Sequence, residues 1–174
     1  MRENLADNVT RGVLAEYIVA SALGVNEGVR SAWDAYDLRT SSGLRVEVKS
    51  SAYLQQWRQR KLSPVQFEVG PKRGWDGETG TMAKDAAWQS DIYVLCLLKH
   101  REKATLNPLD LDQWEAYEVP TELLRERCGT RLKIKIRLGV LATLNIAPVG
   151  FDGLKARVEA VGVSADVRKG ELTA

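Results

Sequence analysis

The fold prediction starts from the stretch L-R-V-E-V-K-S-S, which runs from Leu44 to Ser51. In it, the apolar residues Val46 and Val48 alternate with the charged residues Glu47 and Lys49. A period of two is typical of a β-strand that has one buried and one polar face. Glu47 and Lys49 are therefore expected to lie side by side on the same face of this strand.

A second strand is predicted just upstream, at residues 32–38, which read A-W-D-A-Y-D-L. The turn-forming segment R-T-S-S-G at residues 39–43 would join the two strands. If they pair as a hairpin, Asp37 lies near the closed end and next to Glu47. Asp34 is the alternative acidic residue, but it lies farther from the turn. The hairpin would then bring two carboxylates together with the ammonium group of the neighbouring lysine.

Such a group of charges suits a metal ion. Two neighbouring carboxylates repel each other unless a cation joins them. Mg²⁺ prefers oxygen ligands and keeps several waters, so two carboxylates and a backbone carbonyl would suit it. A bound metal ion activates water and polarises a phosphoryl oxygen, and an adjacent lysine orients the water or stabilises transition-state charge. The pattern therefore predicts metal-assisted phosphodiester hydrolysis. The alternative is an unrelated α/β domain in which Glu47 and Lys49 form a solvated ion pair.

A wider pattern of residues resembles a known family. A predicted helix carries Glu16, Y-D-L follows at residues 36–38, and V-E-V-K-S follows at residues 46–50. This order resembles the core of the PD-(D/E)XK nuclease superfamily, which includes type II restriction enzymes and archaeal Holliday junction resolvases. The resemblance covers residues 8–98, and Tyr36 stands where the family motif has proline, a residue that members of the family often lack.

The resemblance implies a restriction endonuclease-like α/β fold, with a core in the order α-β-β-β-α-β and a mixed central sheet flanked by helices. It also implies a magnesium-dependent endonuclease that acts on DNA, with Mn²⁺ as a substitute for Mg²⁺ and a homodimer as the expected assembly. Asp37, Glu47 and the Val48 carbonyl would bind the metal ion, and Lys49 would act on the attacking water. Glu16 would hold a water near the metal. The alternative function is a non-catalytic nucleic-acid-binding or assembly protein that keeps this fold.

Composition limits the class of protein. The chain has 174 residues, of which 44% are hydrophobic and 28% charged, and this indicates a soluble globular protein. We expect one nuclease-like domain over residues 1–174, with its core at residues 8–99 and an elaboration at residues 100–174. The net charge is only +2, so a nucleic-acid-binding surface must be local. The chain has one histidine, which excludes a histidine-rich metal site.

Cysteine spacing and the N-terminal sequence suggest a compartment. Cys96 and Cys128 have no metal-ligand spacing, so a reducing compartment is expected. The N-terminal residues show no signal-peptide pattern, and the longest apolar run, residues 92–98, is too short to cross a membrane. We therefore expect a cytoplasmic protein without membrane association.

Hydrophobic periodicity predicts the remaining elements. Helices are expected at residues 8–23, 120–127 and 151–161, a short helical turn at 83–88, and strands at 65–69, 91–99, 111–119 and 131–138. The first helix is expected to bury two apolar rows, formed by Val9, Val13 and Tyr17 and by Leu14, Ile18 and Ala22. The strand at 131–138 is expected to face inward through Leu132, Ile134, Ile136 and Leu138.

Three segments are candidates for contact with nucleic acid. They combine cations with aromatic side chains, glycines or a row of charges along a strand, features that suit a phosphate backbone and stacked bases. The candidate residues are Gln56, Arg58, Lys72, Arg73, Trp75, Lys133 and Lys135, with the middle three in an expected loop at residues 70–80. The alternative in each segment is an ordinary polar surface, and a lysine-rich edge strand also prevents aggregation between sheets.

Overall fold

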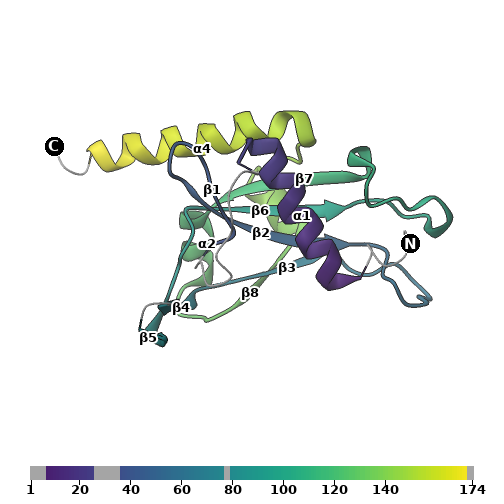
Figure 1. Ribbon diagram of the computed structural model, residues 1–174, viewed down its shortest axis with the longest axis horizontal. Coiled ribbons are helices and arrows are strands. Elements are labelled where there is room, and N and C mark those ends of the chain that lie inside the picture. Colours follow the sequence, from purple (N-terminus) through teal and green to yellow (C-terminus); the bar gives the residue numbers. More distant parts are fainter. Residues whose placement is uncertain (1–6, 26–35, 77–78, 172–174) are drawn as a thin grey trace.

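The computed structural model describes residues 7–25, 36–76 and 79–171. The central sheet has four strands, which are β1 (Leu38–Arg39), β2 (Arg45–Ala52), β6 (Ile92–Leu98) and β7 (Trp114–Pro120). They lie side by side in the order β1-β2-β6-β7 (Figure 1). β2 runs parallel to β6, whereas β1 and β7 are antiparallel to their neighbours. The prediction of a mixed central sheet is therefore confirmed.

β6 is the buried centre of this sheet, as its continuous apolar run indicates. All of its residues are buried. Ile92 and Val94 face one apolar cluster, and Tyr93 and Leu95 face another. The sheet therefore packs a separate core against each of its faces.

Two helices cover the face to which Ile92 and Val94 point. They are α1 (Asn8–Leu23) and α4 (Phe151–Glu171), which lie near each other in Figure 1. Asp7 caps the start of α1 by accepting a hydrogen bond from the Val9 N–H at 2.8 Å. Gly24 ends the helix with a φ of 70°, a conformation that glycine adopts easily. Both ends of α1 agree with the prediction.

The predicted orientation of α1 is wrong in part. Val9, Val13 and Tyr17 are 77%, 62% and 62% exposed. The buried side of the helix instead contains Ala15 and Val19. Alanine has a small side chain, so this side can approach the sheet closely, and the bulkier row turns outward.

The opposite face of the sheet is covered by two strands and two helices. They are β3 (Gln66–Val69), β8 (Ile134–Arg137), α2 (Thr121–Cys128) and α3 (Leu138–Thr143). β3 and β8 form an antiparallel pair in which Phe67 lies opposite Ile136. Both side chains are buried in the second core.

The predicted strand at residues 131–138 is shorter than expected. Ile134 and Ile136 point inward as predicted, but Leu132 is exposed and Leu138 is the first residue of α3. Only four residues of β8 have a partner in β3, and the alternation of buried and exposed residues is confined to this paired part.

A second pair of strands follows β3. β4 (Lys72–Asp76) and β5 (Thr81–Ala87) form an antiparallel hairpin where the sequence predicted a loop followed by a helical turn. The helical-turn prediction at residues 83–88 and the α-β-β-β-α-β order are therefore wrong, because no helix of the described residues lies between β3 and β6. β5 has alanines that favour a helix, but its pairing with β4 decides the conformation. The hairpin lies far from α4 in Figure 1.

The remaining elements are two short 3₁₀ helices, η2 (Lys103–Thr105) and η3 (Leu111–Gln113). Residues 32–35 of the first predicted strand lie outside the described residues, which include only its end as β1. In the part of the chain that the structure describes, no helix is long and apolar enough to cross a membrane.

Candidate active site

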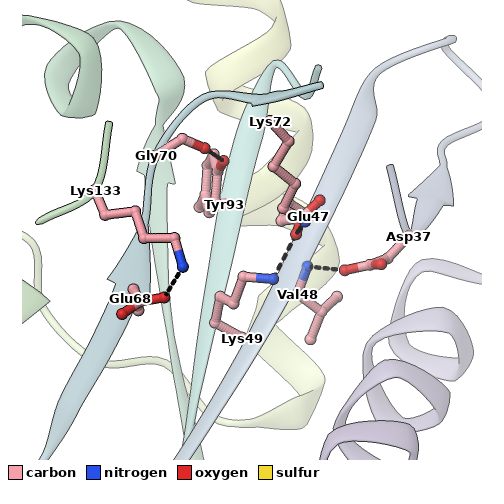
Figure 2. A network of polar contacts seen from close by, with 9 residues as sticks. All are labelled: Asp37, Glu47, Val48, Lys49, Glu68, Gly70, Lys72, Tyr93 and Lys133. Carbon is pink, nitrogen blue, oxygen red and sulfur yellow. Dashed lines mark hydrogen bonds and ion pairs between the residues drawn. The ribbon is translucent and has the colours of Figure 1, made fainter. Parts of the chain in front are cut away.

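The hairpin of β1 and β2 fixes Asp37. In the hairpin, Leu38 pairs with Val46, and the Asp37 N–H donates to the Val46 carbonyl at 3.0 Å. The Asp37 side chain turns back to β2, where its Oδ2 accepts a hydrogen bond from the Val48 N–H at 2.7 Å (Figure 2). The predicted approach of Asp37 to the E-V-K segment is thus confirmed, and one of its two carboxylate oxygens is held by the backbone.

Glu47 is the most deeply buried acidic group of the site. Glu47 is only 2% exposed and lies on β2 opposite Tyr93 of β6. An ionised carboxylate at such a position is costly unless cations and hydrogen bonds compensate for the lost water. Two cations meet this need: the Lys49 Nζ lies 2.5 Å from the Glu47 Oε1, and the Lys72 Nζ contacts the same oxygen (Figure 2).

The charges of the site act on each other. Burial alone would lower the pKa of Lys49, but the negative charges of Glu47 and Asp37 and the hydrogen bond to Glu47 together raise it. Lys49 is therefore an ammonium ion at neutral pH. Burial and then the charge of Glu47 raise the pKa of Tyr93, so the phenol stays neutral. Lys49 and Lys72 both pair with Glu47, and the charge of Asp37 also acts on Lys49.

The oxygen atoms of the site fit a hard divalent cation. Asp37 and Glu47 each offer carboxylate oxygens. Residues two apart on a strand direct their carbonyls to the same edge, so the Val48 carbonyl points to the edge at which the Val46 carbonyl accepts from Asp37. Two carboxylates and a carbonyl, completed by water, are a ligand set that Mg²⁺ uses. The described residues contain no group of three or more His, Cys, Asp or Glu side chains that could hold a metal ion, so a divalent cation here would also need the carbonyl and water as ligands.

The structure gives the other acidic candidates different positions. Glu16 is partly buried on α1, directly after Ala15, which packs in the same core as Val46 and Val48 of β2. Its role near the metal stays a prediction. Asp34 lies outside the described residues.

The candidate residues for nucleic acid are spread over three places. Gln56 and Arg58 are exposed after β2, and the Gln56 carbonyl accepts a hydrogen bond from the Lys103 Nζ at 3.0 Å. Arg73 and Trp75 are exposed on β4, on the same strand as the lysine that reaches Glu47.

The third place is the basic surface between α2 and β8. Lys133 is exposed and pairs with Glu68 at 2.8 Å, and Lys135 is exposed on β8. Together with Arg127 and Arg131 they line an open hollow of about 670 Å³. We define these four cations as the basic hollow. Of its two arginines, Arg131 belongs to the row of cations predicted along the strand at residues 131–138, whereas Arg127 was missed, although cations stand on both sides of the helix end in R-E-R-C-G-T-R-L-K.

The sequence analysis also missed the position of Lys72. It was a candidate only for phosphate contact, whereas its ammonium group lies on the buried carboxylate of Glu47. The two residues are 25 positions apart, and no pattern in the sequence links them.

Comparison with known proteins supports a nuclease. The model of one protein family, described as bacteriophage T4 endonuclease IV, matches residues 1–132. The matched part contains Asp37, Glu47, Lys49 and Lys72, and ends before β8. No curated protein matches the chain.

Proposed function

The chain belongs to the bacteriophage T4 endonuclease IV family, and we propose that it is a metal-dependent endonuclease that hydrolyses phosphodiester bonds in DNA. The observation that carries this proposal is the buried carboxylate of Glu47, which lies on the segment of β2 that the Asp37 carboxylate contacts and which touches the ammonium group of Lys49. The motif's resemblance to the PD-(D/E)XK superfamily supports the same roles.

Asp37 and Glu47, with the Val48 carbonyl, would hold Mg²⁺, and Mn²⁺ would replace it. When bound, the metal ion supplies electrophilic assistance to the reacting phosphate and makes water more acidic. The Val48 N–H holds one oxygen of Asp37, so the carboxylate keeps its orientation while its other oxygen stays available.

Lys49 acts directly on the reacting atoms. Its ammonium group is kept charged by Glu47 and Asp37, and it stands on the polar face of β2 beside the carboxylates. From this position it donates a hydrogen bond to the attacking water or to the phosphoryl oxygen that gains negative charge. A neutral side chain at position 49 would provide no such stabilisation.

The DNA backbone would cross the basic hollow on its way to the site. Arg127, Arg131, Lys133 and Lys135 surround an open space, and phosphates need this kind of local positive surface in a chain with a net charge of +2. Glu68 links the two regions. Lys133 pairs with it and is the main cause of the lowered pKa of the Glu68 carboxyl, and the charge of Lys49 makes a smaller contribution in the same direction. Figure 2 shows Glu68, on β3, and Lys133, just before β8, near Lys49.

The test is cleavage of a substrate panel in Mg²⁺, in Mn²⁺ and in EDTA. The panel contains linear duplex DNA, supercoiled plasmid, single-stranded DNA, a four-way junction and RNA. We expect metal-dependent cutting of DNA that falls by about 100-fold or more in Asp37→Asn and in Lys49→Met. Lys155→Met is the control, because Lys155 is exposed on α4, which packs against the other face of the sheet.

Circular dichroism and thermal unfolding of each variant would show whether it folds. Cutting that continues in EDTA, or that is equal in Asp37→Asn and the wild type, would contradict the proposal. One observation favours the alternative, a non-catalytic nucleic-acid-binding protein: two ammonium groups, those of Lys49 and Lys72, compensate the buried Glu47 carboxylate. DNA binding with no cleavage and no metal binding would support that alternative.

A further inference from the structure

Two ammonium groups share one oxygen of a buried carboxylate. Lys49 comes from the strand that carries Glu47, and its side chain is 28% exposed. Lys72 comes from the β4–β5 hairpin and is 49% exposed. The two cations therefore differ in attachment: Lys49 is enclosed beside Glu47, whereas Lys72 reaches the same oxygen from the edge of the site and keeps access to water.

The base of the hairpin is fixed close to Glu47 by a residue of β6. Tyr93 lies opposite Glu47 in the sheet register, and its hydroxyl donates to the Gly70 carbonyl at 3.4 Å, just before β4 (Figure 2). Its ring meets the Trp88 ring edge-on, with centroids 5.8 Å apart, just after β5. The two ends of the hairpin are thus anchored on one side chain, and this anchoring sets the start of β4, and with it Lys72, over the carboxylate.

We infer that Lys72 is an exchangeable counter-ion of the active site. It neutralises Glu47 while no divalent cation is bound, and it moves to a phosphate of the DNA when a divalent cation takes the same carboxylate oxygen. This inference rests on the proposed function, because it assumes that Glu47 is a metal ligand.

The exchange follows from charge and access. A divalent cation within bonding distance of the Glu47 Oε1 cannot share that atom with two ammonium groups. Lys72 is the group that leaves, since it is more exposed and its strand is not the one that carries the carboxylate. Once released, its ammonium group lies beside the cation, where the reacting phosphate must bind. A phosphate offers it a new anionic partner there.

The inference predicts opposite effects on two ligands. Removing the Lys72 charge takes away a competitor of the metal ion and should tighten metal binding. The same change takes away a phosphate contact that becomes available only after the metal has bound, and should weaken the coupling between metal and DNA. Coupling between two ligands is reciprocal, so either can be titrated first. A lysine that only contacts DNA at the surface would leave the metal affinity unchanged.

The experiment compares the full-length wild type with Lys72→Met, Lys72→Arg and Lys84→Met. Calorimetric titration with Mg²⁺ measures the metal affinity without turnover. We expect a Kd that is about threefold to tenfold lower in Lys72→Met, the range of an ion pair with a half-exposed partner. Lys72→Arg should raise the Kd, because a guanidinium holds a carboxylate with two hydrogen bonds. Lys84 is exposed on β5 of the same hairpin, and Lys84→Met should bind Mg²⁺ as the wild type does.

DNA binding provides the second measurement. Fluorescence anisotropy with a labelled oligonucleotide in EDTA and in Ca²⁺ gives the factor by which the metal ion strengthens binding. This factor should fall about threefold to tenfold in Lys72→Met relative to wild type and to Lys84→Met. A Mg²⁺ Kd in Lys72→Met that equals or exceeds the wild-type value, in a folded protein, would overturn the inference.

Asp37→Asn separates this failure from failure of the proposed function. If Asp37→Asn abolishes metal binding while Lys72→Met leaves it unchanged, the metal site holds and the exchange of Lys72 is wrong. If the folded wild type binds no divalent cation, the metal site and the exchange are both wrong.

Discussion

Replacing Gly70 by alanine tests whether the base of the β4–β5 hairpin lies where the site requires it. A Cβ added at Gly70 would stand 2.2 Å from the Leu132 carbonyl oxygen, 3.0 Å from the Leu132 carbonyl carbon and 3.1 Å from the Lys133 Cα. All three are backbone atoms, so no change of rotamer relieves the overlap. The backbone at Gly70 and the backbone at residues 132–133 must move apart by about 1 Å for the added Cβ to reach ordinary contact with the Leu132 carbonyl oxygen, at 3.4 Å or more.

The cost of this movement follows from what lies beside it. Val69 pairs with Ile134 at the end of the β3–β8 ladder, directly next to the overlap, so separation of the backbones strains that pair. Overpacking of this kind costs about 1–3 kcal/mol, and the rigid backbone contact places Gly70→Ala near the upper end. Alanine also lowers the conformational entropy of the unfolded chain relative to glycine, and this offsets about 0.4–1 kcal/mol of the loss in stability. We expect a net loss of about 2 kcal/mol in the free energy of unfolding, which corresponds to a fall of about 4–8 °C in Tm.

Urea unfolding and thermal unfolding would measure this loss. Gly74→Ala is a matched control in the same hairpin, because its added Cβ would meet only the Gln89 Nε2, a side-chain atom, at 3.5 Å. We expect the stability of Gly74→Ala to stay within about 0.5 kcal/mol of the wild type. If Gly70→Ala were as stable as Gly74→Ala, the close approach of residues 70 and 132 would not exist. The position of Lys72 over Glu47 would then lose its support as well.

Three further changes test the cores, the charges and the DNA path. Ile136→Ala should lower the free energy of unfolding by about 2–5 kcal/mol in urea, since Ile136 is fully buried in the second core, and less than 1 kcal/mol would contradict that packing. Burial and then the hydrogen bond to Glu115 raise the pKa of Tyr117, so its contribution to stability is complete below about pH 10 and is lost as the pH rises above that value. In Tyr117→Phe the fall in unfolding free energy between pH 9 and about 11 should therefore be smaller than in the wild type, and an equal fall would refute the assignment. Lys133→Ala and Lys135→Ala should each weaken DNA binding and reduce the slope of log K against log salt by about 1, and an unchanged slope would exclude a phosphate contact.

Local patterns predicted much of the fold. The strands predicted from the alternation in Arg45–Ala52 and from the apolar run in Ile92–Leu98 are confirmed as β2 and β6. Such patterns are reliable because the order of apolar residues along a strand reflects whether one or both of its faces are buried. The ends of α1 were predictable from Asp7 and Gly24, which act through hydrogen bonds and φ within a few residues. The position of Asp37 was predictable for the same reason, since a five-residue turn leaves the hairpin little freedom.

Contacts between distant segments could not be predicted in this way. The segment T-M-A-K-D-A-A at Thr81–Ala87 contains alanines, which favour a helix, and it forms a strand because β4 pairs with it. The rotation of α1 has a similar cause. Val9, Val13 and Tyr17 form an apolar row that is suitable for burial, but the side of the helix that packs in the core carries the small side chain of Ala15 instead.

The second cation of the site shows how physical reasoning extends beyond a motif. The E-V-K segment supplies one ammonium group for two carboxylates, and Glu47 is too deeply buried to be balanced by water. A second positive charge must therefore come either from a metal ion or from elsewhere in the chain. The sequence has 25 lysines and arginines, Lys49 among them, and gives no reason to choose among the others. The tertiary structure selects Lys72, because the hydrogen bond between Tyr93 and Gly70 fixes the start of the hairpin beside Glu47. Lys72 then lies within reach of the Glu47 Oε1. The ammonium group of Lys72 is held on the carboxylate by an ion pair and a hydrogen bond from a half-exposed side chain, which is the basis of the inference that a divalent cation replaces it.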